Sequence, residues 1–381
     1  MTKQGFDLAV VGAGVVGLAH AWAAARLGKR VVVIERDTQA NGASIRNFGF
    51  ITITGQQRGA VWRRARRSRD LWAAAAGPAG IPIEQRGLTL TVRTPEAEAV
   101  ARGFLDTEMG DGCAWLDIHE LSRRFPMFGP AQTRGALFSP HEIRVESRTA
   151  IPALRAWLEA RSGVTFMTAT AVLEVSPPTI RTSRGEVEAA AAVVCPGDDL
   201  VTLFPDAIEA QGVTRCRLSM LRLADPGFRL PSAVMSDLGL TRYLGHAALP
   251  EAIAHRRVLE ATQGDCLRHG VHLIVTQSAD GSLVVGDSHH YGDTPDPFAP
   301  AEVEDLILGE FRAATGLAPT PVTERWTGTY SSAAGSMFAV APAPDVRLVM
   351  VTSGTGASTA FAIAEEVIGA LYDTALGDIG L

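Results

Sequence analysis

Three glycines near the start of the chain have the spacing of a phosphate-binding turn. Gly12, Gly14 and Gly17 follow a short apolar run directly. In such a turn the first glycine permits a sharp bend, the second lets the backbone approach a pyrophosphate, and the third lets a helix pack closely on a strand. The N–H groups at the helix N-terminus then bind the phosphate charges. These residues indicate a dinucleotide site.

An acidic residue supports the same interpretation. Glu35 ends a second apolar run, 23 residues after Gly12, where a carboxylate can accept hydrogen bonds from a ribose 2′-hydroxyl. The sequence therefore predicts an adenine dinucleotide, and this motif leaves both NAD and FAD open. Glu35 disfavours NADP, whose 2′-phosphate it would repel, although the adjacent Arg36 weakens that exclusion.

A second glycine-rich turn lies near the other end of the chain. Gly354 and Gly356 separate an apolar run at residues 346–351 from residues 359–371, whose apolar side chains recur at helical spacing. The N-terminus of a helix carries partial positive charge. We therefore expect this turn to contact the same long ligand.

The rest of the pattern predicts the elements that position these turns. Strands are expected at residues 6–11 and 30–34, with a helix between them that ends at Gly28. Further expected elements are a hairpin across residues 273–287 with an Asp-Gly turn, helices at residues 152–161 and 301–315, and strand-like runs at residues 87–92, 164–175 and 188–195.

Composition narrows the classes of function. The 381 residues include 35 basic and 41 acidic ones, for a net charge of −6, whereas nucleic-acid binders normally carry a basic excess. No signal peptide and no apolar run long enough to span a bilayer is present in the sequence. We expect a soluble cytoplasmic protein with no nucleic-acid partner and no membrane span, and its oligomeric state stays open.

Cysteine and histidine spacing predicts no metal site. The four cysteines form no Cys-x-x-Cys pair, which excludes the common zinc spacings and a dithiol redox centre. Cys195 is expected to be a buried apolar residue, not a nucleophile. His289 and His290 have no third ligand at metal spacing, and we expect them in a solvated turn.

Nearly the whole chain resembles the D-amino-acid oxidase superfamily of FAD-dependent amine oxidoreductases, which contains glycine oxidase and monomeric sarcosine oxidase. The resemblance rests on both glycine-rich turns, the small-residue loop at 42–49, Cys-Pro-Gly at 195–197 and Trp-Thr-Gly at 326–328. It implies a mixed α/β (α+β) fold of two domains. A Rossmann-like FAD-binding domain (residues 1–85, 150–212 and 325–381) would carry an inserted antiparallel-sheet substrate domain (residues 86–149 and 213–324).

The resemblance also implies the residues that contact the cofactor. Some relatives attach the flavin to a cysteine near Trp326, but residues 326–345 contain no cysteine, so we expect non-covalent FAD. The implied FAD contacts are Gly12, Gly14, Gly17, Glu35, Arg36, Ser44, Asn47, Gly49, Val172, Gly354, Thr355, Gly356, Ser358 and Thr359.

One segment departs from the pattern of the glycine oxidase relatives. They carry Trp-Ala-Gly-Leu-Arg-Pro, whose arginine binds the carboxylate of the amino acid, whereas residues 326–331 read Trp-Thr-Gly-Thr-Tyr-Ser. Tyr330 therefore stands where the arginine would be, and a phenol does not replace a bidentate guanidinium. An α-amino acid becomes a less favoured substrate than another anionic or polar amine.

Three segments resemble a narrower subgroup, FAD oxidoreductases associated with the breakdown of aminophosphonates. They are residues 43–50, 139–146 and 353–356. A phosphonate dianion needs several hydrogen-bond donors, and the substrate contacts that we expect are Arg46, His141, Arg144, Tyr330 and Thr355.

Structural roles are open for three of these residues. Arg144 could instead form an ion pair with Glu142 or Glu146, His141 a structural hydrogen bond, and Tyr330 an aromatic packing contact. Arg46 is the favoured contact because its loop should cross the flavin.

The favoured function is oxidation of a primary or N-methylated amine, above all 2-aminoethylphosphonate or its N-methyl derivatives. Hydride transfer to flavin N5 would form an imine that hydrolyses to an aldehyde, and oxygen or another acceptor would reoxidise the flavin. The sequence identifies no general base. The alternatives are oxidation of an N-methyl amino acid or a 2-hydroxy acid, and a non-catalytic, flavin-bearing assembly protein.

Overall fold

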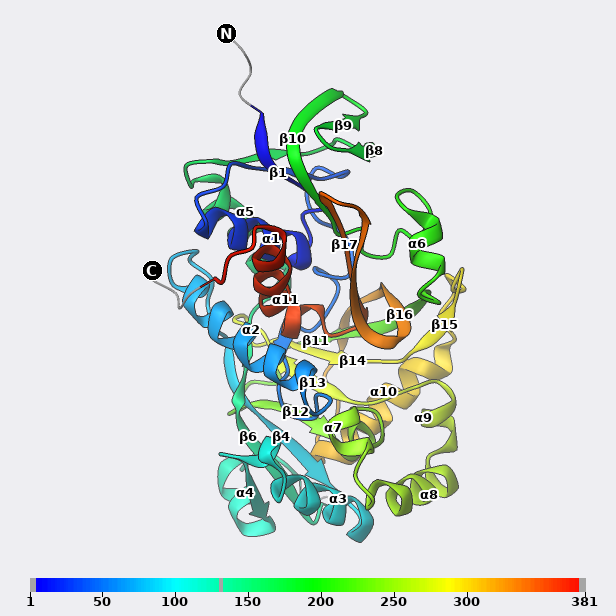
Figure 1. Cartoon of the computed structure of the whole chain (residues 1–381). Coiled ribbons are helices and arrows are strands. Elements are labelled where there is room, and N and C mark those ends of the chain that lie inside the picture. The colour runs from blue at the N-terminus through cyan, green and yellow to red at the C-terminus, as the bar shows by residue number, and fades with distance from the viewer. Residues whose placement is uncertain (1–4, 130–132, 377–381) are drawn as a thin grey trace.

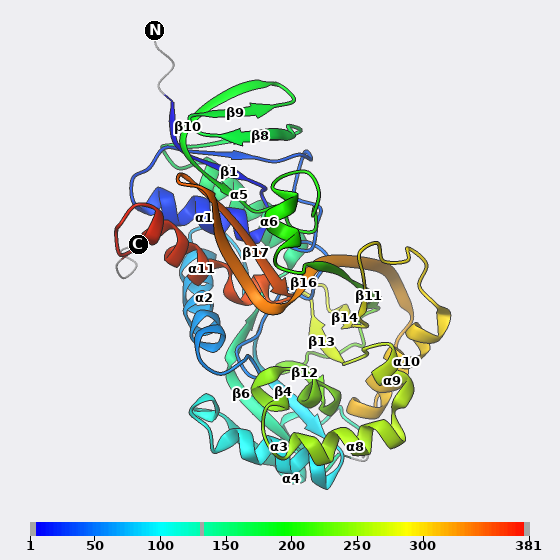
Figure 2. The same cartoon turned by 45° about the vertical axis from the view of Figure 1, so that its right-hand side comes forward.

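A five-stranded parallel sheet forms one end of the molecule, drawn at the top in Figures 1 and 2. The computed structural model of the chain describes residues 5–129 and 133–376. Each neighbouring pair in this sheet is parallel, as expected for strands joined by helical crossovers. The strand order is β7 (Val164–Met167), β2 (Val31–Ile34), β1 (Phe6–Val11), β10 (Gly185–Val194) and β17 (Val346–Ser353).

Both faces of the parallel sheet are covered. Helix α11 packs between α1 and α2 on one face, where the Trp22 and Phe361 rings meet edge-on with centroids 5.4 Å apart. On the other face, β8 pairs antiparallel with β9, and β9 pairs antiparallel with the start of β10. These elements are α1 (Val15–Arg26), α2 (Ala60–Ala76), α5 (Ser147–Glu159), α11 (Gly356–Leu371), β8 (Val172–Ser176) and β9 (Thr179–Thr182).

A second, larger sheet lies below the first in both views. Its strands pair antiparallel except for β12 and β4, which run parallel. The sheet is therefore mostly antiparallel, as expected. The order is β16 (Val322–Ala343), β11 (Thr214–Leu223), β14 (Leu283–Gly286), β13 (Ile274–Gln277), β12 (Ala233–Ser236), β4 (Gln85–Val92), β6 (Gly135–Arg144) and β5 (Ala114–Asp117), with β3 (Phe50–Ile51) beside β6 and β15 (His290–Gly292) beside β11.

Helices cover the outer side of this second sheet. Helix α10 is amphipathic, and Val303, Ile307 and Phe311 on its apolar face are buried in one core with β13 and β14. The remaining helical segments are α3 (Pro95–Leu105), η1 (Glu108–Gly110), α4 (Ile118–Arg124), α6 (Pro205–Glu209), η2 (Asp237–Thr241), α7 (Leu244–Ala247), α8 (Ala252–Thr262), α9 (Gly264–Arg268) and α10 (Ala301–Thr315).

Strand β16 links the two sheets. Its first half pairs with β11, from Val322 to Ser332, and its second half pairs with β17, from Met337 to Ala343. Figure 2 shows this long strand passing from one sheet to the other. Residues near the middle of β16, Tyr330 among them, are thereby held where the two sheets meet.

The mixed α/β fold with two sheet-based parts confirms the expected fold class. Two local expectations need correction. The run at residues 164–175 forms two strands, β7 and β8, and α5 begins at Ser147, not at residue 152. Pro152 lies inside α5, where it lacks an N–H donor, yet the burial of its neighbours Ile151 and Leu154 holds the helix together.

The residue limits of the two predicted domains stay a prediction, and their outer ends, residues 1–4 and 377–381, lie outside the described residues. Across the part of the chain that the structure describes, no helix is both long enough and apolar enough to cross a membrane.

Candidate active site

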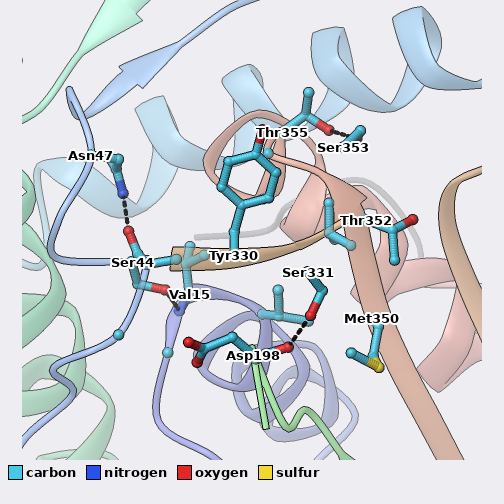
Figure 3. Close-up of a pocket in the computed structure, with 18 of the residues that line it drawn as sticks. Val15, Ser44, Asn47, Asp198, Tyr330, Ser331, Met350, Thr352, Ser353 and Thr355 are labelled. Carbon is cyan, nitrogen blue, oxygen red and sulfur yellow. Dashed lines mark hydrogen bonds between the residues drawn. The ribbon is translucent and has the colours of Figure 1, made fainter. Parts of the chain in front are cut away.

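A cavity of ≈ 610 Å³ connects the two glycine-rich turns and extends to the second sheet, a size typical of ligand sites. Figure 3 shows Ser44 and Asn47 on one side of it and Ser353 and Thr355 on the other, with the Tyr330 ring between them. The expected FAD contacts that line the cavity are Gly12, Gly14, Gly17, Glu35, Arg36, Ser44, Asn47, Val172, Gly354, Thr355, Gly356 and Ser358.

The N-terminal turn has no room for side chains. Gly12 has a φ of +98°, and a Cβ atom there would lie 2.6 Å from the Cys195 carbonyl oxygen. A Cβ on Gly17 would lie 1.9 Å from the Gly12 carbonyl oxygen. Strand β1 therefore reaches α1 through backbone packed on backbone, which leaves the N-terminus of α1 open towards the cavity.

The loop after β2 closes over this turn. The Val15 N–H donates to Ser44 Oγ at 2.9 Å. Asn47 organises the loop itself: its side-chain amide donates to the Ala43 carbonyl at 2.7 Å, and its Oδ1 accepts from the Gly49 N–H at 2.6 Å. The loop is thus held in shape by its own hydrogen bonds.

Glu35 lies at the edge of the cavity, at the end of β2. Its carboxylate accepts hydrogen bonds from the Ala13 N–H at 2.7 Å and from the Asp37 N–H at 3.0 Å. The next residue, Arg36, forms an exposed ion pair with Asp199 at 3.4 Å. Asp199 thus pairs with the Arg36 guanidinium, the group that could otherwise bind the 2′-phosphate of NADP.

The C-terminal turn joins β17 to α11. Gly354 has a φ of +72°, and a Cβ atom there would lie 3.0 Å from Tyr330 Cζ. No side chain caps the N-terminus of α11, and its first turn carries no acidic residue. The partial positive charge of this helix end therefore faces the cavity without a neutralising group.

The family follows from the sequence match. Residues 7–369 match the DAO family model, described as FAD dependent oxidoreductase. The chain belongs to this family. It is therefore an FAD-dependent oxidoreductase. No curated protein matches the chain.

Solved structures of low sequence identity share the fold. Glycine oxidase from Geobacillus kaustophilus superposes with a TM-score of 0.77 at 18% identity, over 98% of this chain and 96% of that one. L-α-glycerophosphate oxidase from Mycoplasma pneumoniae, solved with FAD bound, gives 0.74 at 15% identity, over 97% and 95%. Iminodiacetate oxidase from Chelativorans sp. BNC1 gives 0.69 at 16% identity, over 98% and 97%.

Two expected FAD contacts do not line the cavity. Gly49 has a φ of +67°, and a Cβ atom there would lie 1.7 Å from the Val145 carbonyl oxygen, so this glycine permits close backbone packing. Thr359 lies one turn into α11, where its hydroxyl donates to the Thr355 carbonyl at 2.9 Å. Both residues support the cavity from behind its wall.

Only part of the expected substrate set comes together. Arg46, Tyr330 and Thr355 line the cavity, whereas His141 and Arg144 do not. His141 Nε2 lies 2.6 Å from the Asp111 carbonyl oxygen, a structural hydrogen bond. Arg144 is buried and pairs with Glu146 at 2.9 Å. Their contacts and their place outside the cavity favour the structural roles that the sequence left open for both residues.

An unexpected arginine lies at the substrate end. Arg242, between η2 and α7, lines the cavity and donates from Nη2 to the Tyr330 hydroxyl at 3.3 Å. Burial by itself would lower the pKa of Arg242, but the neighbouring Tyr330 and Tyr291 raise it above its ordinary value, so the guanidinium stays charged. A cation is thus present beside Tyr330, supplied by a different segment from the one used by the glycine oxidase relatives.

Three further polar residues line the same wall and are all buried: His272, Asp287 and His289. His272 Nδ1 lies 3.3 Å from Asp287 Oδ1, and His289 Nε2 lies 3.7 Å from Asp287 Oδ2. Burial raises the pKa of Asp287 to about 8, against the lowering effect of Arg242. Burial, followed by Arg242, holds the pKa of both imidazoles well below its ordinary value.

These positions correct the expectation of a solvated turn at the two adjacent histidines. His289 is buried in the cavity wall, while His290 is half-buried outside the cavity and lies 3.2 Å from His269. Sequence spacing missed His272 and Asp287 as well. The ligand atoms of His272, Asp287 and His289 lie within 4.8 Å of one another, but the Arg242 charge opposes a metal cation there, and we assign no metal site.

Cys195 also lines the cavity, next to the N-terminal turn. Burial raises the pKa of its thiol, so the sulfur stays protonated and does not act as a nucleophile.

Proposed function

We propose that this enzyme oxidises an amine that also carries an anionic group, with 2-aminoethylphosphonate and its N-methyl derivatives as favoured substrates. The carbon next to nitrogen loses a hydride, and the resulting imine hydrolyses to an aldehyde and ammonia or methylamine. Oxygen or another acceptor then reoxidises the cofactor.

The observation that carries this proposal is the charged Arg242 at the far end of the FAD cavity. Among the described residues no carboxylate forms a direct ion pair with it, and Asp287 interacts with it only at longer range, so the guanidinium can bind an anionic ligand. Tyr330 and Tyr291 lie beside it and add hydroxyl donors, and Arg46 lines the cavity from the loop after β2. Several donors from separate elements suit the three oxygens of a phosphonate.

The solved structures with this fold support the same class of substrate. One is a glycine oxidase, one an iminodiacetate oxidase and one an L-α-glycerophosphate oxidase. Glycine and iminodiacetate, in the first two names, are amines that carry carboxylates. Glycerophosphate, in the third name, is a phosphate ester. The fold is therefore compatible with both halves of an aminophosphonate.

FAD itself would supply the hydride acceptor, flavin N5. The chain would hold its phosphates at the N-terminus of α1 and its ribose at Glu35, through contacts that stay a prediction. Reduction leaves negative charge on the flavin ring, and we propose that the open N-terminus of α11 stabilises that charge. Binding is proposed to be non-covalent.

The test is anaerobic mixing of the purified holoenzyme with a panel of candidate substrates. The panel contains 2-aminoethylphosphonate, its N-methyl derivative, sarcosine, glycine and 2-hydroxyglutarate, and the visible flavin band is followed. We expect the two phosphonates to bleach this band fastest. Bleaching by sarcosine alone would support an N-methyl amino acid, bleaching by 2-hydroxyglutarate a hydroxy acid, and no bleaching at all a protein without turnover.

A further inference from the structure

Two acceptor atoms lie close together at the substrate end of the cavity when the Asp287 carboxyl is ionised. His289 Nδ1 lies 2.8 Å from the Gly270 carbonyl oxygen, and because a carbonyl only accepts, Nδ1 carries the proton of the neutral ring. His289 Nε2 is then an acceptor. It lies 3.7 Å from Asp287 Oδ2, which is also an acceptor when the carboxyl is ionised.

The other carboxylate oxygen of Asp287 also lacks a hydrogen-bond donor among the described residues. Asp287 Oδ1 lies 3.3 Å from His272 Nδ1, yet neither atom has a hydrogen-bond partner of good geometry among the described residues. His272 Nε2 lies 3.5 Å from the Tyr243 hydroxyl. A buried polar atom without a partner is costly. A ligand that brings N–H donors would satisfy this cluster.

The charged and titratable groups around Asp287 come from several elements. Arg242 and Tyr243 lie between η2 and α7, and His272 precedes β13. The groups near Asp287 and its two histidine neighbours include Cys216, Arg217, Arg242, Tyr243, His272, His289, His290, Tyr291 and Tyr330. Among them only the arginines hold a permanent charge, because the histidines stay neutral and the phenols protonated.

We propose that Asp287 is the proton acceptor for the substrate ammonium group and that His289 Nε2 accepts a second N–H of the same nitrogen. This inference rests on the proposed function and adds the base that the sequence does not identify. It follows from the placement of a fixed cation, Arg242, and an unsatisfied acceptor pair on one cavity wall. A zwitterion with an anionic and an ammonium end matches that arrangement, whereas a bare metal ion matches only the acceptor pair.

The proposed step moves one proton from the substrate ammonium to Asp287. One N–H bond of the ammonium breaks and one O–H bond to Asp287 forms, which leaves a neutral amine with a lone pair. Only this form can lose a hydride from the adjacent carbon, because an ammonium has no electron pair to donate. The proton leaves Asp287 for solvent before the next turnover. No oxidant is needed in this step.

The test compares the pH dependence of kcat/KM for holoenzyme and Asp287→Asn, with the amine that reduces the flavin fastest. Below its pKa of about 8 the Asp287 carboxyl is protonated and cannot accept a proton. The wild-type profile should therefore rise with an apparent pKa near 8. In Asp287→Asn the rise should move to the pKa of the amine itself, about 10. At pH 8 kcat/KM should fall on the order of 100-fold, the deficit of neutral amine at that pH.

Binding provides an independent readout. At pH 6, where the Asp287 carboxyl is protonated, ethylphosphonate, which has no amine, should perturb the flavin spectrum of wild type and Asp287→Asn with the same Kd within a factor of two, which shows that the variant is folded. His289→Gln should raise KM several-fold, while the matched variant His290→Gln, outside the cavity, should not.

Three results would overturn the inference. An identical rising limb in wild type and Asp287→Asn would remove Asp287 as the acceptor. Equal kinetics of His289→Gln and His290→Gln would remove the second contact. Loss of activity on dialysis against a chelator, restored by a divalent metal, would assign the cluster to a metal ion. If instead no amine reduces the wild-type flavin, the proposed function fails, and these comparisons separate the two failures.

Discussion

At the scale of single residues, the substrate end of the cavity depends on Arg242. Glycine oxidase relatives place an arginine in the segment that here carries Tyr330, and this chain places its guanidinium on a separate loop, 3.3 Å from the Tyr330 hydroxyl. The charge is therefore present although the expected motif is absent. Because the guanidinium comes from a different segment of the chain, we propose that the pocket accepts an anion other than an α-carboxylate.

Replacing Arg242 by Met should weaken the binding of an anionic amine selectively. Charge-assisted hydrogen bonds of this kind contribute about 1.5–3 kcal/mol, so we expect KM for 2-aminoethylphosphonate to rise about 10- to 100-fold. Oxidation of propylamine, which has no anion, should change little. Arg257→Met on the exposed surface of α8 is the control. Equal losses for both amines would show that Arg242 does not bind the anion.

Asp287 should make stability depend on pH. Its folded-state pKa is raised by burial to about 8, so the proton is held more tightly when folded. This stabilisation is complete below the unfolded pKa, about 4, and is lost as pH rises through 8. Between about pH 4 and pH 8, the free energy of unfolding of wild type should therefore fall by up to roughly 1.4 kcal/mol per pH unit relative to that of Asp287→Asn.

Thermal melting from pH 5 to pH 9 measures this effect. The Tm of Asp287→Asn minus that of wild type should grow with pH and level off above 8. Asp280→Asn in the nearby hairpin turn is the control, because hydrogen bonds from Ser282 lower the pKa of Asp280, and its difference should not grow. A constant Tm difference for Asp287→Asn would contradict a raised pKa.

At the scale of elements, a buried ion-pair network holds the segment that leads to Arg242. Arg93, just after β4, donates from Nε to Asp237 at 2.9 Å and from Nη1 to Glu310 at 3.0 Å. Asp237 begins η2, and Arg242 follows the end of η2. This network therefore ties β4, α10 and the loop of Arg242 into one unit.

Replacing Arg93 by Met should destabilise the protein strongly. It would leave two carboxylates, Asp237 and Glu310, buried side by side without a cation. Removing one partner of a buried pair costs about 3–5 kcal/mol, and chemical denaturation of the holoenzyme should show this loss. Arg102→Met, which breaks an exposed pair with Glu98, should cost less than about 1 kcal/mol. Similar losses for both would contradict the role of the network.

Sequence reasoning was successful where contacts are local. The turns at Gly12 and Gly354 could be predicted because both need a positive φ, and Gly17 because it packs directly on the backbone of Gly12. At the substrate end the sequence predicted Arg46 and Tyr330 but not Arg242 and Asp287, since the four residues come from four separate segments.

The pairing of His272 with Asp287 could not be predicted from the hairpin either. These residues exchange backbone hydrogen bonds of 3.2 and 3.1 Å just beyond β13 and β14. The register of the hairpin, in which Ile274 pairs with Gly286, would have placed Leu273 opposite Asp287. His289 was misassigned because a polar His-His sequence resembles a solvated turn, whereas the sheet buries only the first of the two.

At the scale of the whole molecule, the two sheets enclose one cavity, and we propose that it holds both FAD and the substrate. The parallel sheet contributes the glycine-rich turns, the second sheet contributes Asp287 and His289, and β16 joins the two parts beside Tyr330. The fold explains how the family can keep its FAD site while the substrate end changes.

The mode of FAD attachment can be tested on the intact protein. Residues 326–345 contain no cysteine, and within the described cavity wall the thiol of Cys195 has a raised pKa because of burial. Precipitation with acid should therefore release all of the yellow chromophore into the supernatant. Colour that stays in the washed pellet would show a covalent bond.

The most direct test of the proposed activity is a single anaerobic turnover with 2-aminoethylphosphonate. Holoenzyme is mixed with excess substrate, the visible flavin band is recorded, and the aldehyde is trapped and quantified. We predict complete bleaching with one aldehyde and one ammonia released per FAD. An unchanged flavin band and no aldehyde, in a preparation that glycine or sarcosine does bleach, would contradict the proposed substrate.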